Sequence, residues 1–138
     1  MAKKPEKTWV FAPRKSPTEK VPVDLKAAVT AEASELIEKV LKPKHVQPPP
    51  KKPRFNYVID VWSKWHGSYF YFGATYACPG SNAMSPKFET KFVRLEYLGG
   101  KRFALAYLRH TEKWFTAYPR LTLDECLKVI KSNELFQP

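Results

Sequence analysis

A few polar side chains in the middle of the sequence could do acid–base or nucleophilic chemistry: Asp60, His66, Cys78, His110 and Glu112. None of them belongs to a spacing that such chemistry uses. The sequence contains no G-x-S-x-G, H-E-x-x-H, phosphate-binding loop or paired-carboxylate motif. We therefore expect a protein with no enzymatic activity, no catalytic residues and no cofactor.

The run 109–111, Arg-His-Thr, is the strongest candidate for a catalytic role. An arginine and an imidazole at a turn could polarise a phosphate or a carbonyl group. We favour the simpler interpretation of an exposed turn, in which Arg109 pairs with Glu112 or with Glu96 across a sheet. An enzyme that uses His110 stays as a third hypothesis, which full function after His110→Ala would exclude.

The two cysteines, Cys78 and Cys126, lie far apart and outside any C-x-x-C pair, so neither zinc nor another metal is expected. Cys78 has no basic neighbour in sequence to lower its pKa, which favours a structural thiol. The sequence opens with no secretory signal pattern and has no apolar run of about 18 residues. These features predict a protein of the reducing cytoplasm that does not enter a membrane.

The chain of 138 residues carries a net charge of +11, which favours anionic partners. Two proline-rich segments hold most of this excess. Residues 1–22 have six basic and two acidic side chains and read as an extended arm, in which Trp9 and Phe11 form an apolar anchor. Residues 43–54 have no acidic side chain and read as a semi-rigid linker. The basic residues of this linker are Lys44, Lys51, Lys52 and Arg54.

Helical signals lie on both sides of the central region. An apolar stripe at helical spacing predicts a helix from Asp24, as its cap, to about Leu41, with Pro43 stopping it soon afterwards. The second helix begins with a capping box, in which Thr122 and Glu125 bond reciprocally, and should end near residues 131–133. Phe136 could then pin the tail.

A period of two between the helices predicts five strands. Their approximate ranges are 55–65, 69–78, 87–98, 102–109 and 113–118. Gly99-Gly100 signals a hairpin, and Pro119 should end the last strand. In the first strand, Val61 and Trp65 fall on one face, whereas Val58, Trp62 and Lys64 fall on the other.

Together these elements predict an α+β fold over residues 23–138, in one domain. Its sheet would be a five-stranded antiparallel meander, with the N-terminal and C-terminal helices packed on one face. The opposite face would then expose aromatic and basic residues, unless the arm covers it. Trp62, Tyr69 and Tyr97 are among the aromatic residues interleaved with the basic ones.

Basic grooves with aromatic surfaces bind nucleic acid, because cations contact phosphate and bases stack on rings. We therefore hypothesise a non-enzymatic protein that binds RNA or DNA with its basic arms and this sheet face. Arm and linker candidates are Lys44, Lys51, Lys52 and Arg54. Sheet candidates are Lys64, Tyr71, Lys91, Arg94, Arg102, Tyr107, Arg109, Lys113 and Trp114. The usual RNA-recognition motif sequence, K/R-G-F-G-F-V-x-F, is absent.

The alternative is a protein–protein interaction module. In that hypothesis the proline-rich arm and linker, with the Trp9 and Phe11 anchor, dock on a partner protein or a larger assembly. A single stoichiometric protein partner that survives nuclease treatment would favour this alternative.

Three segments carry a family resemblance: FNYVIDVWSKWHGSYFYFGATYACPG (55–80), SPKFETKFVRLEYLGGKRFALAYLRHTEKW (85–114) and LTLDECLKVI (121–130). They resemble a family of short bacterial proteins known only as a domain of unknown function, over roughly residues 22–138. The resemblance implies a bacterial, cytoplasmic origin and one compact domain. It implies no activity, cofactor or site residue.

Overall fold

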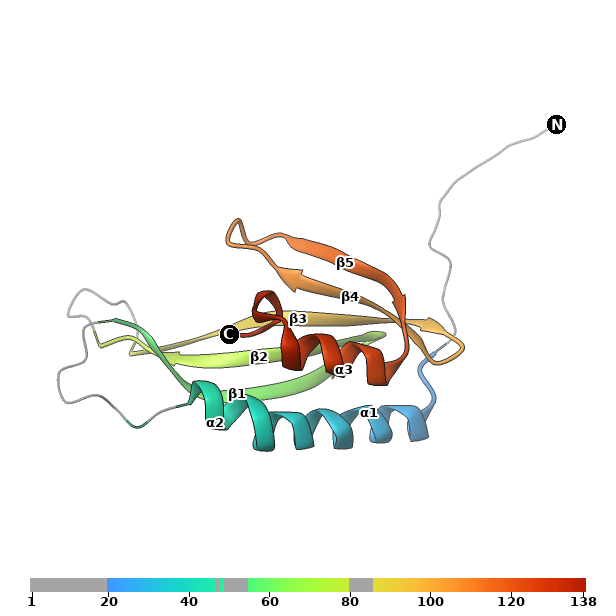
Figure 1. The fold of residues 1–138 in the computed structure, drawn as a ribbon, viewed down its shortest axis with the longest axis horizontal. Coiled ribbons are helices and arrows are strands. Elements are labelled where there is room, and N and C mark those ends of the chain that lie inside the picture. The colour runs from blue at the N-terminus through green and yellow to red at the C-terminus, as the bar shows by residue number, and fades with distance from the viewer. Residues whose placement is uncertain (1–19, 47, 49–54, 80–85) are drawn as a thin grey trace.

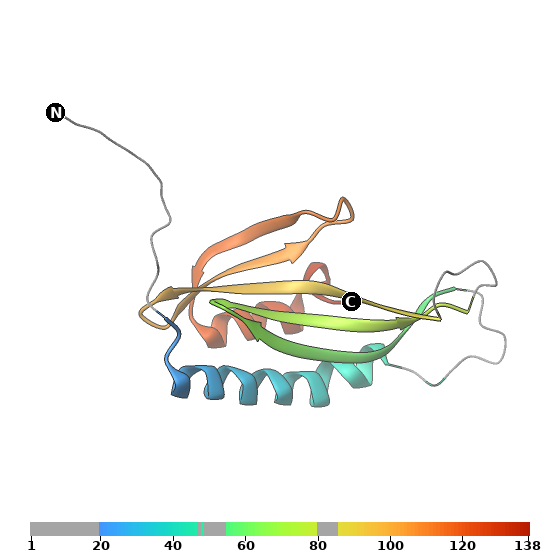
Figure 2. The ribbon, with the colours of Figure 1, turned by 180° about the vertical axis from the view of Figure 1, so that it is seen from behind.

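Five strands form one antiparallel sheet in the order of the chain, β1-β2-β3-β4-β5, as predicted (Figures 1 and 2). The computed structural model describes residues 20–46, 48, 55–79 and 86–138. The strands are β1 (Tyr57–His66), β2 (Tyr69–Ala77), β3 (Lys87–Gly99), β4 (Arg102–Leu108) and β5 (Trp114–Leu121). The helical segments are α1 (Val23–Leu36), η2 (Ile37–Leu41), α2 (Lys42–His45), α3 (Leu123–Ser132) and η3 (Glu134–Phe136).

The helices α1 and α3 cover the same face of the sheet, which confirms the predicted α+β arrangement (Figure 1). The core lies between the helices and the sheet, where apolar side chains are buried away from water. Alternate residues of β2, Phe70 and Phe72, point into it and are fully buried. Val29 of α1 and Ile130 of α3 are buried from the helix side.

The N-terminal helix differs from its prediction at both ends. Pro22 occupies the N-cap, and Asp24 lies in the first turn without a capping hydrogen bond. The helix also continues through Pro43 to His45. A π-helical stretch, η2, precedes Pro43, and Pro43 sits in the first turn of α2. The hydrogen-bond register changes in this π-helical stretch, directly before the proline, which has no N–H to donate. The helix therefore includes residues 43–45 of the segment that was predicted as the linker.

The second helix begins and ends as predicted. The Glu125 N–H donates to Thr122 Oγ1 at 3.2 Å, and Glu125 Oε1 accepts from the Thr122 N–H at 2.9 Å. These bonds complete the capping box. They also hold the pKa of the Glu125 carboxyl below its ordinary value, because they stabilise the charged form. The helix ends at Ser132.

Two strand predictions were wrong for identifiable reasons. The pairing of β1 with β2 shifts between Val58 and Asp60, so Val58 and Val61 are both buried despite their odd spacing. Such an irregularity reverses the alternation of faces. In addition, β5 runs past Pro119 to Leu121. An edge strand accepts proline, because the missing donor can face away from the neighbouring strand.

The C-terminal turn closes one end of the core, as predicted for Phe136. This side chain in η3 is fully buried. Its ring centroid lies 5.2 Å from that of Tyr107 and 6.2 Å from that of Tyr118. The tail therefore packs on β4 and β5 beside α3. Among the described residues, no helix has both the length and the apolar character needed to span a membrane.

Candidate nucleic-acid interface

We call the face of the sheet opposite α1 and α3 the open face; Figure 2 shows the sheet from this side. A line of cross-strand partners crosses it. Cross-strand partners point to the same side of a sheet. Lys64 of β1 lies opposite Tyr71, and Tyr71 lies opposite Arg94. Arg94 lies opposite Ala106 of β4. Because Phe70 and Phe72 point into the core, Tyr71 between them points outward.

Arg94 lies between two aromatic rings on the open face. Its guanidinium carbon is 4.9 Å from the ring centroid of Tyr69 and 5.1 Å from that of Trp114. Trp114 also lies 5.8 Å from the ring centroid of Tyr71, although β3 and β4 separate their strands. Three strand spacings amount to about 14 Å. The side chains of β2 and β5 therefore converge above Arg94, which fixes the orientation of its planar guanidinium.

The cations of the open face have aromatic neighbours instead of carboxylate partners. Lys91 Nζ lies 4.8 Å from the ring centroid of Tyr71, and Lys64 Nζ lies 5.4 Å from that of Trp62. Within the described residues, Lys64, Lys91 and Arg94 form no ion pair. Arg94 Nε is buried without a hydrogen-bond partner. Among the described residues, no carboxylate therefore neutralises these three cations.

A groove of about 350 Å³ crosses the open face between Trp62 and Trp114, and we call it the Trp62–Trp114 groove. Its walls come from β1, β3, β4 and β5. The lining residues are Trp62, Lys64, Glu89, Thr90, Lys91, Leu108 and Trp114. The groove thus combines two indole rings, one aliphatic side chain and two ammonium groups with one hydroxyl and one carboxylate.

The indole of Trp62 is held in one orientation by the neighbouring strand. Trp62 lies opposite Gly73, and a Cβ at Gly73 would overlap the indole ring. The indole N–H donates to Thr75 Oγ1 at 3.1 Å. Glycine inside a strand allows this close approach. One side of the ring therefore rests on backbone, and the ring lines the groove.

The comparisons with known proteins bear on the family alone. A family described as Domain of unknown function (DUF3024) matches residues 6–138. The chain belongs to this family. This confirms the predicted membership of a domain family of unknown function. Neither the curated proteins nor the solved structures contain a match to the chain.

Four basic candidates of this DUF3024 chain lie away from the groove. Lys44 donates to Gln137 Oε1 at 2.8 Å, beside the C-terminal turn. Arg102 contributes to the lowered pKa of Glu125 at the start of α3, after the larger effect of the Thr122 hydrogen bonds. Arg109 stacks over Phe115 at 5.2 Å, and Lys113 is exposed in the turn before β5.

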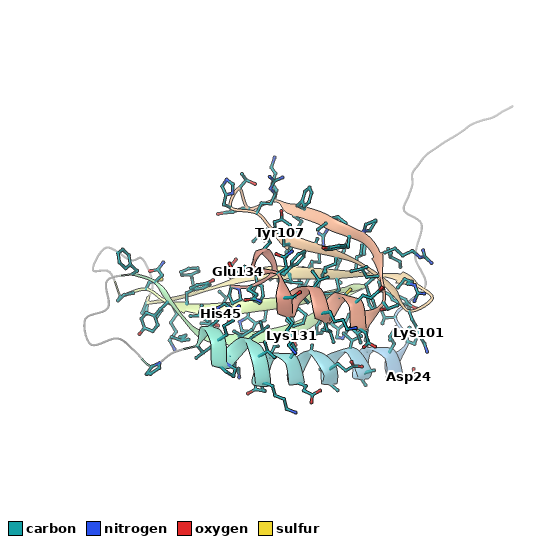
Figure 3. The ribbon with its side chains drawn as sticks, in the orientation of Figure 1. Asp24, His45, Lys101, Tyr107, Lys131 and Glu134 are labelled. Atoms are coloured by element: carbon teal, nitrogen blue, oxygen red, sulfur yellow. The ribbon has the colours of Figure 1, made fainter. Side chains whose placement is uncertain are left out.

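Tyr107 lies on the helix-covered side of the sheet, and the structure does not bring it to the open face. Figure 3 labels Tyr107. Its ring centroid lies 5.2 Å from that of Phe136 and 5.5 Å from that of Phe115. The cause is alternation in β4, where Tyr107 lies opposite Val93, a core residue. Of the predicted sheet residues, the open face brings together Lys64, Tyr71, Lys91, Arg94 and Trp114. The candidates Trp9, Phe11, Lys51, Lys52 and Arg54 lie outside the described residues.

The sheet candidates predicted from sequence omitted several residues that shape the groove, with Trp62, Glu89 and Thr90 among them. Two further omissions are Gly73 and Leu108. Gly73 admits the indole of Trp62, and Leu108 forms part of the wall beside Trp114. A glycine in the middle of an aromatic strand signals a close approach, and this signal was present in the sequence. Leu108 carries no such signal, because an apolar strand residue is ordinarily read as core.

The candidate catalytic side chains do not gather in this DUF3024 chain. Asp60 Oδ1 accepts from the Val61 N–H at 2.9 Å and lies 3.4 Å from Lys42 Nζ. His66 is exposed at the end of β1, and His110 is exposed in the turn after β4. In the described part of the chain, no three His, Cys, Asp or Glu side chains are grouped to hold a metal. Among the described residues, Arg109 makes no ion pair with Glu112 or Glu96, the two partners predicted for it. Its guanidinium stacks on the ring of Phe115.

Proposed function

We propose that this chain is a non-enzymatic nucleic-acid-binding protein and that its open face contacts RNA or DNA. One observation carries the proposal. Lys64, Lys91 and Arg94 lie on the same face as Trp62 and Trp114, and within the described residues these cations have no carboxylate partner. Phosphate contacts and stacking surfaces are thus combined in one place.

The cations supply the electrostatic part of the interaction. Lysine and arginine that neutralise phosphates release counterions, so affinity depends steeply on salt. The guanidinium of Arg94 is already oriented by Tyr69 and Trp114. A pre-oriented group loses little conformational freedom on binding. The net charge of +11 adds attraction at longer range.

The aromatic residues supply contacts that do not depend on base sequence. Every base has a flat π surface that can stack on an indole or a phenol ring. Trp62 and Trp114 line the groove from opposite edges of the sheet. This composition favours a sequence-tolerant binder over a reader of one particular base sequence.

The proposed setting is a bacterial cytoplasm. Both Cys78 and Cys126 are free thiols, and free thiols persist in a reducing compartment. There the partner would be cellular RNA or DNA, alone or within a larger assembly.

Direct binding tests the proposal. The purified, nuclease-treated chain is mixed with labelled single-stranded and double-stranded RNA and DNA of about 16 nucleotides, in about 50 and about 200 mM salt. Three single-strand phosphate contacts give a salt slope of about −2, and hence roughly a twentyfold loss of affinity over this range. Absence of binding at the lower salt would overturn the proposal. A stoichiometric protein partner retained by such a chain would favour docking through the proline-rich arm.

A further inference from the structure

We infer that the Trp62–Trp114 groove takes an unpaired base stacked on Trp62, so that the ligand is a single strand and not a duplex. This inference rests on the proposed function and narrows it to one class of nucleic acid. It is drawn from three features of the groove: a fixed ring, a space of about 350 Å³ that Leu108 and Trp114 also line, and two lysines among its lining residues.

The fixed ring is the indole of Trp62. It rests on the backbone at Gly73 and donates to Thr75 Oγ1 at 3.1 Å. The Thr75 hydroxyl in turn donates to Glu89 Oε2 at 3.4 Å. These contacts set the plane of the indole before any ligand arrives. A stacking platform that is already oriented costs little entropy when a base binds.

The Trp62 ring also lines the groove, where a ligand can reach it. Lys64 stands over it with Nζ at 5.4 Å from the ring centroid, but Lys64 is an exposed side chain on a flexible stem. A base that stacks on the indole can displace the ammonium group toward a neighbouring phosphate. The cation–π contact is then exchanged for a phosphate contact.

The rest of the groove combines apolar and polar lining residues, which suits a base, whose faces stack and whose edges are polar, with a phosphate on either side of it in the strand. Leu108 of β4 and Trp114 of β5 line the groove together with Trp62 of β1, and Lys91 lines it from β3, which lies between β1 and β4 in the sheet. Bases in a duplex are paired and stacked on one another, so their faces cannot reach an indole in a protein groove. An unpaired base in a single strand can turn its face to the protein.

The test compares ligands that differ only in their access to bases. The full chain is titrated with a single strand of about 16 thymidines, the same length of abasic strand, and a duplex of that length. The expected order of affinity places the thymidine strand above both of the others. Equal binding of all three ligands, each with a steep salt dependence, would overturn the inference and leave the proposed function standing. No binding of any ligand would overturn both.

Variants of Trp62 separate stacking from charge. Trp62→Leu keeps an apolar side chain on Gly73 but removes the flat ring, and it should weaken thymidine-strand binding roughly 5- to 150-fold. Trp62→Phe keeps a ring and should retain most of the affinity. The matched control is Phe115→Leu, because Phe115 is an aromatic residue of β5, 43% exposed, on the helix-covered side. A loss in Phe115→Leu equal to that in Trp62→Leu would overturn the inference.

Protein folding is checked in each variant by circular dichroism and thermal melting. If Trp62→Leu fails to fold, Trp62→Phe and the abasic strand still decide the matter. An abasic strand that binds the wild-type chain as tightly as the thymidine strand excludes stacking on any ring of the groove.

Discussion

The indole of Trp62 in β1 lies directly on the backbone of Gly73 in β2, with no room for a methyl group between them. The Trp62 indole can occupy this position only because its partner in β2, Gly73, has no side chain. It also gives the open face a flat ring of fixed orientation at the margin of the groove.

Gly73→Ala should lower the free energy of unfolding by about 1–3 kcal/mol, because the added methyl overlaps the Trp62 ring. In a Trp62→Ala background the same change should be neutral or stabilise by roughly 0.5 kcal/mol, since alanine is favoured over glycine in a strand. Urea unfolding of the four proteins in this double-mutant cycle measures the coupling. Equal effects of Gly73→Ala in both backgrounds would show that the clash does not exist.

Phe136→Ala should destabilise the protein by about 3–5 kcal/mol, because a fully buried ring leaves a cavity beside Tyr107 and Tyr118. The neighbouring Leu135 is 59% exposed, and Leu135→Ala should change stability by less than about 0.5 kcal/mol. Thermal melting distinguishes the two variants. Similar melting temperatures would mean that the C-terminal turn is not docked on the sheet.

Thr122→Ala should lower the free energy of unfolding by about 1 kcal/mol, because it removes the side-chain acceptor at the start of α3.

Glu125→Gln tests whether the negative charge of the Glu125 carboxylate stabilises the same capping box. The pKa of Glu125 is lower in the folded chain, so its stabilisation is present above the unfolded value near 4.5 and disappears as the pH falls through the folded value. The stability difference between wild type and Glu125→Gln should therefore narrow below about pH 4.5. A constant difference from neutral to acidic pH would contradict this assignment.

Only one of the two thiols should react with an aromatic disulfide reagent in the folded chain. Cys126 is fully buried in α3, and burial raises the pKa of its thiol to about 12. Reaction requires the thiolate. Cys78 is partly exposed at the end of β2. Cys78→Ala should abolish the native reaction, whereas Cys126→Ala should leave it unchanged. Rapid reaction of both thiols in the native wild type would count against the buried position of α3.

Local patterns in the sequence were sufficient to predict the order of helices and strands. The capping box at Thr122 can be recognised from four consecutive residues, and the outward direction of Tyr71 follows from its place between Phe70 and Phe72. These features depend on neighbours in the chain. In the strands, the exceptions at Val58 and Pro119 arise where pairing between strands overrides the local pattern.

The groove itself was only partly predictable, because its key contacts join distant segments. Trp114 reaches Arg94 and Tyr71 across intervening strands, and no spacing in the sequence encodes this convergence. Tyr107 illustrates the converse. An aromatic residue among basic ones was assigned to the binding surface, but strand alternation directs it to Phe136 and the helices.

The salt dependence of binding in two matched variants tests most directly whether the open face is the contact surface. Lys64→Ala with Lys91→Ala removes two charges from the groove. Lys128→Ala with Lys131→Ala removes two charges from α3 on the opposite side (Figure 3 labels Lys131). We predict that the first pair makes the slope of log affinity against log salt shallower by about 1.4 on single strands, and that the second pair leaves it unchanged. Equal changes in both pairs, or no change in the first, would contradict binding by the open face.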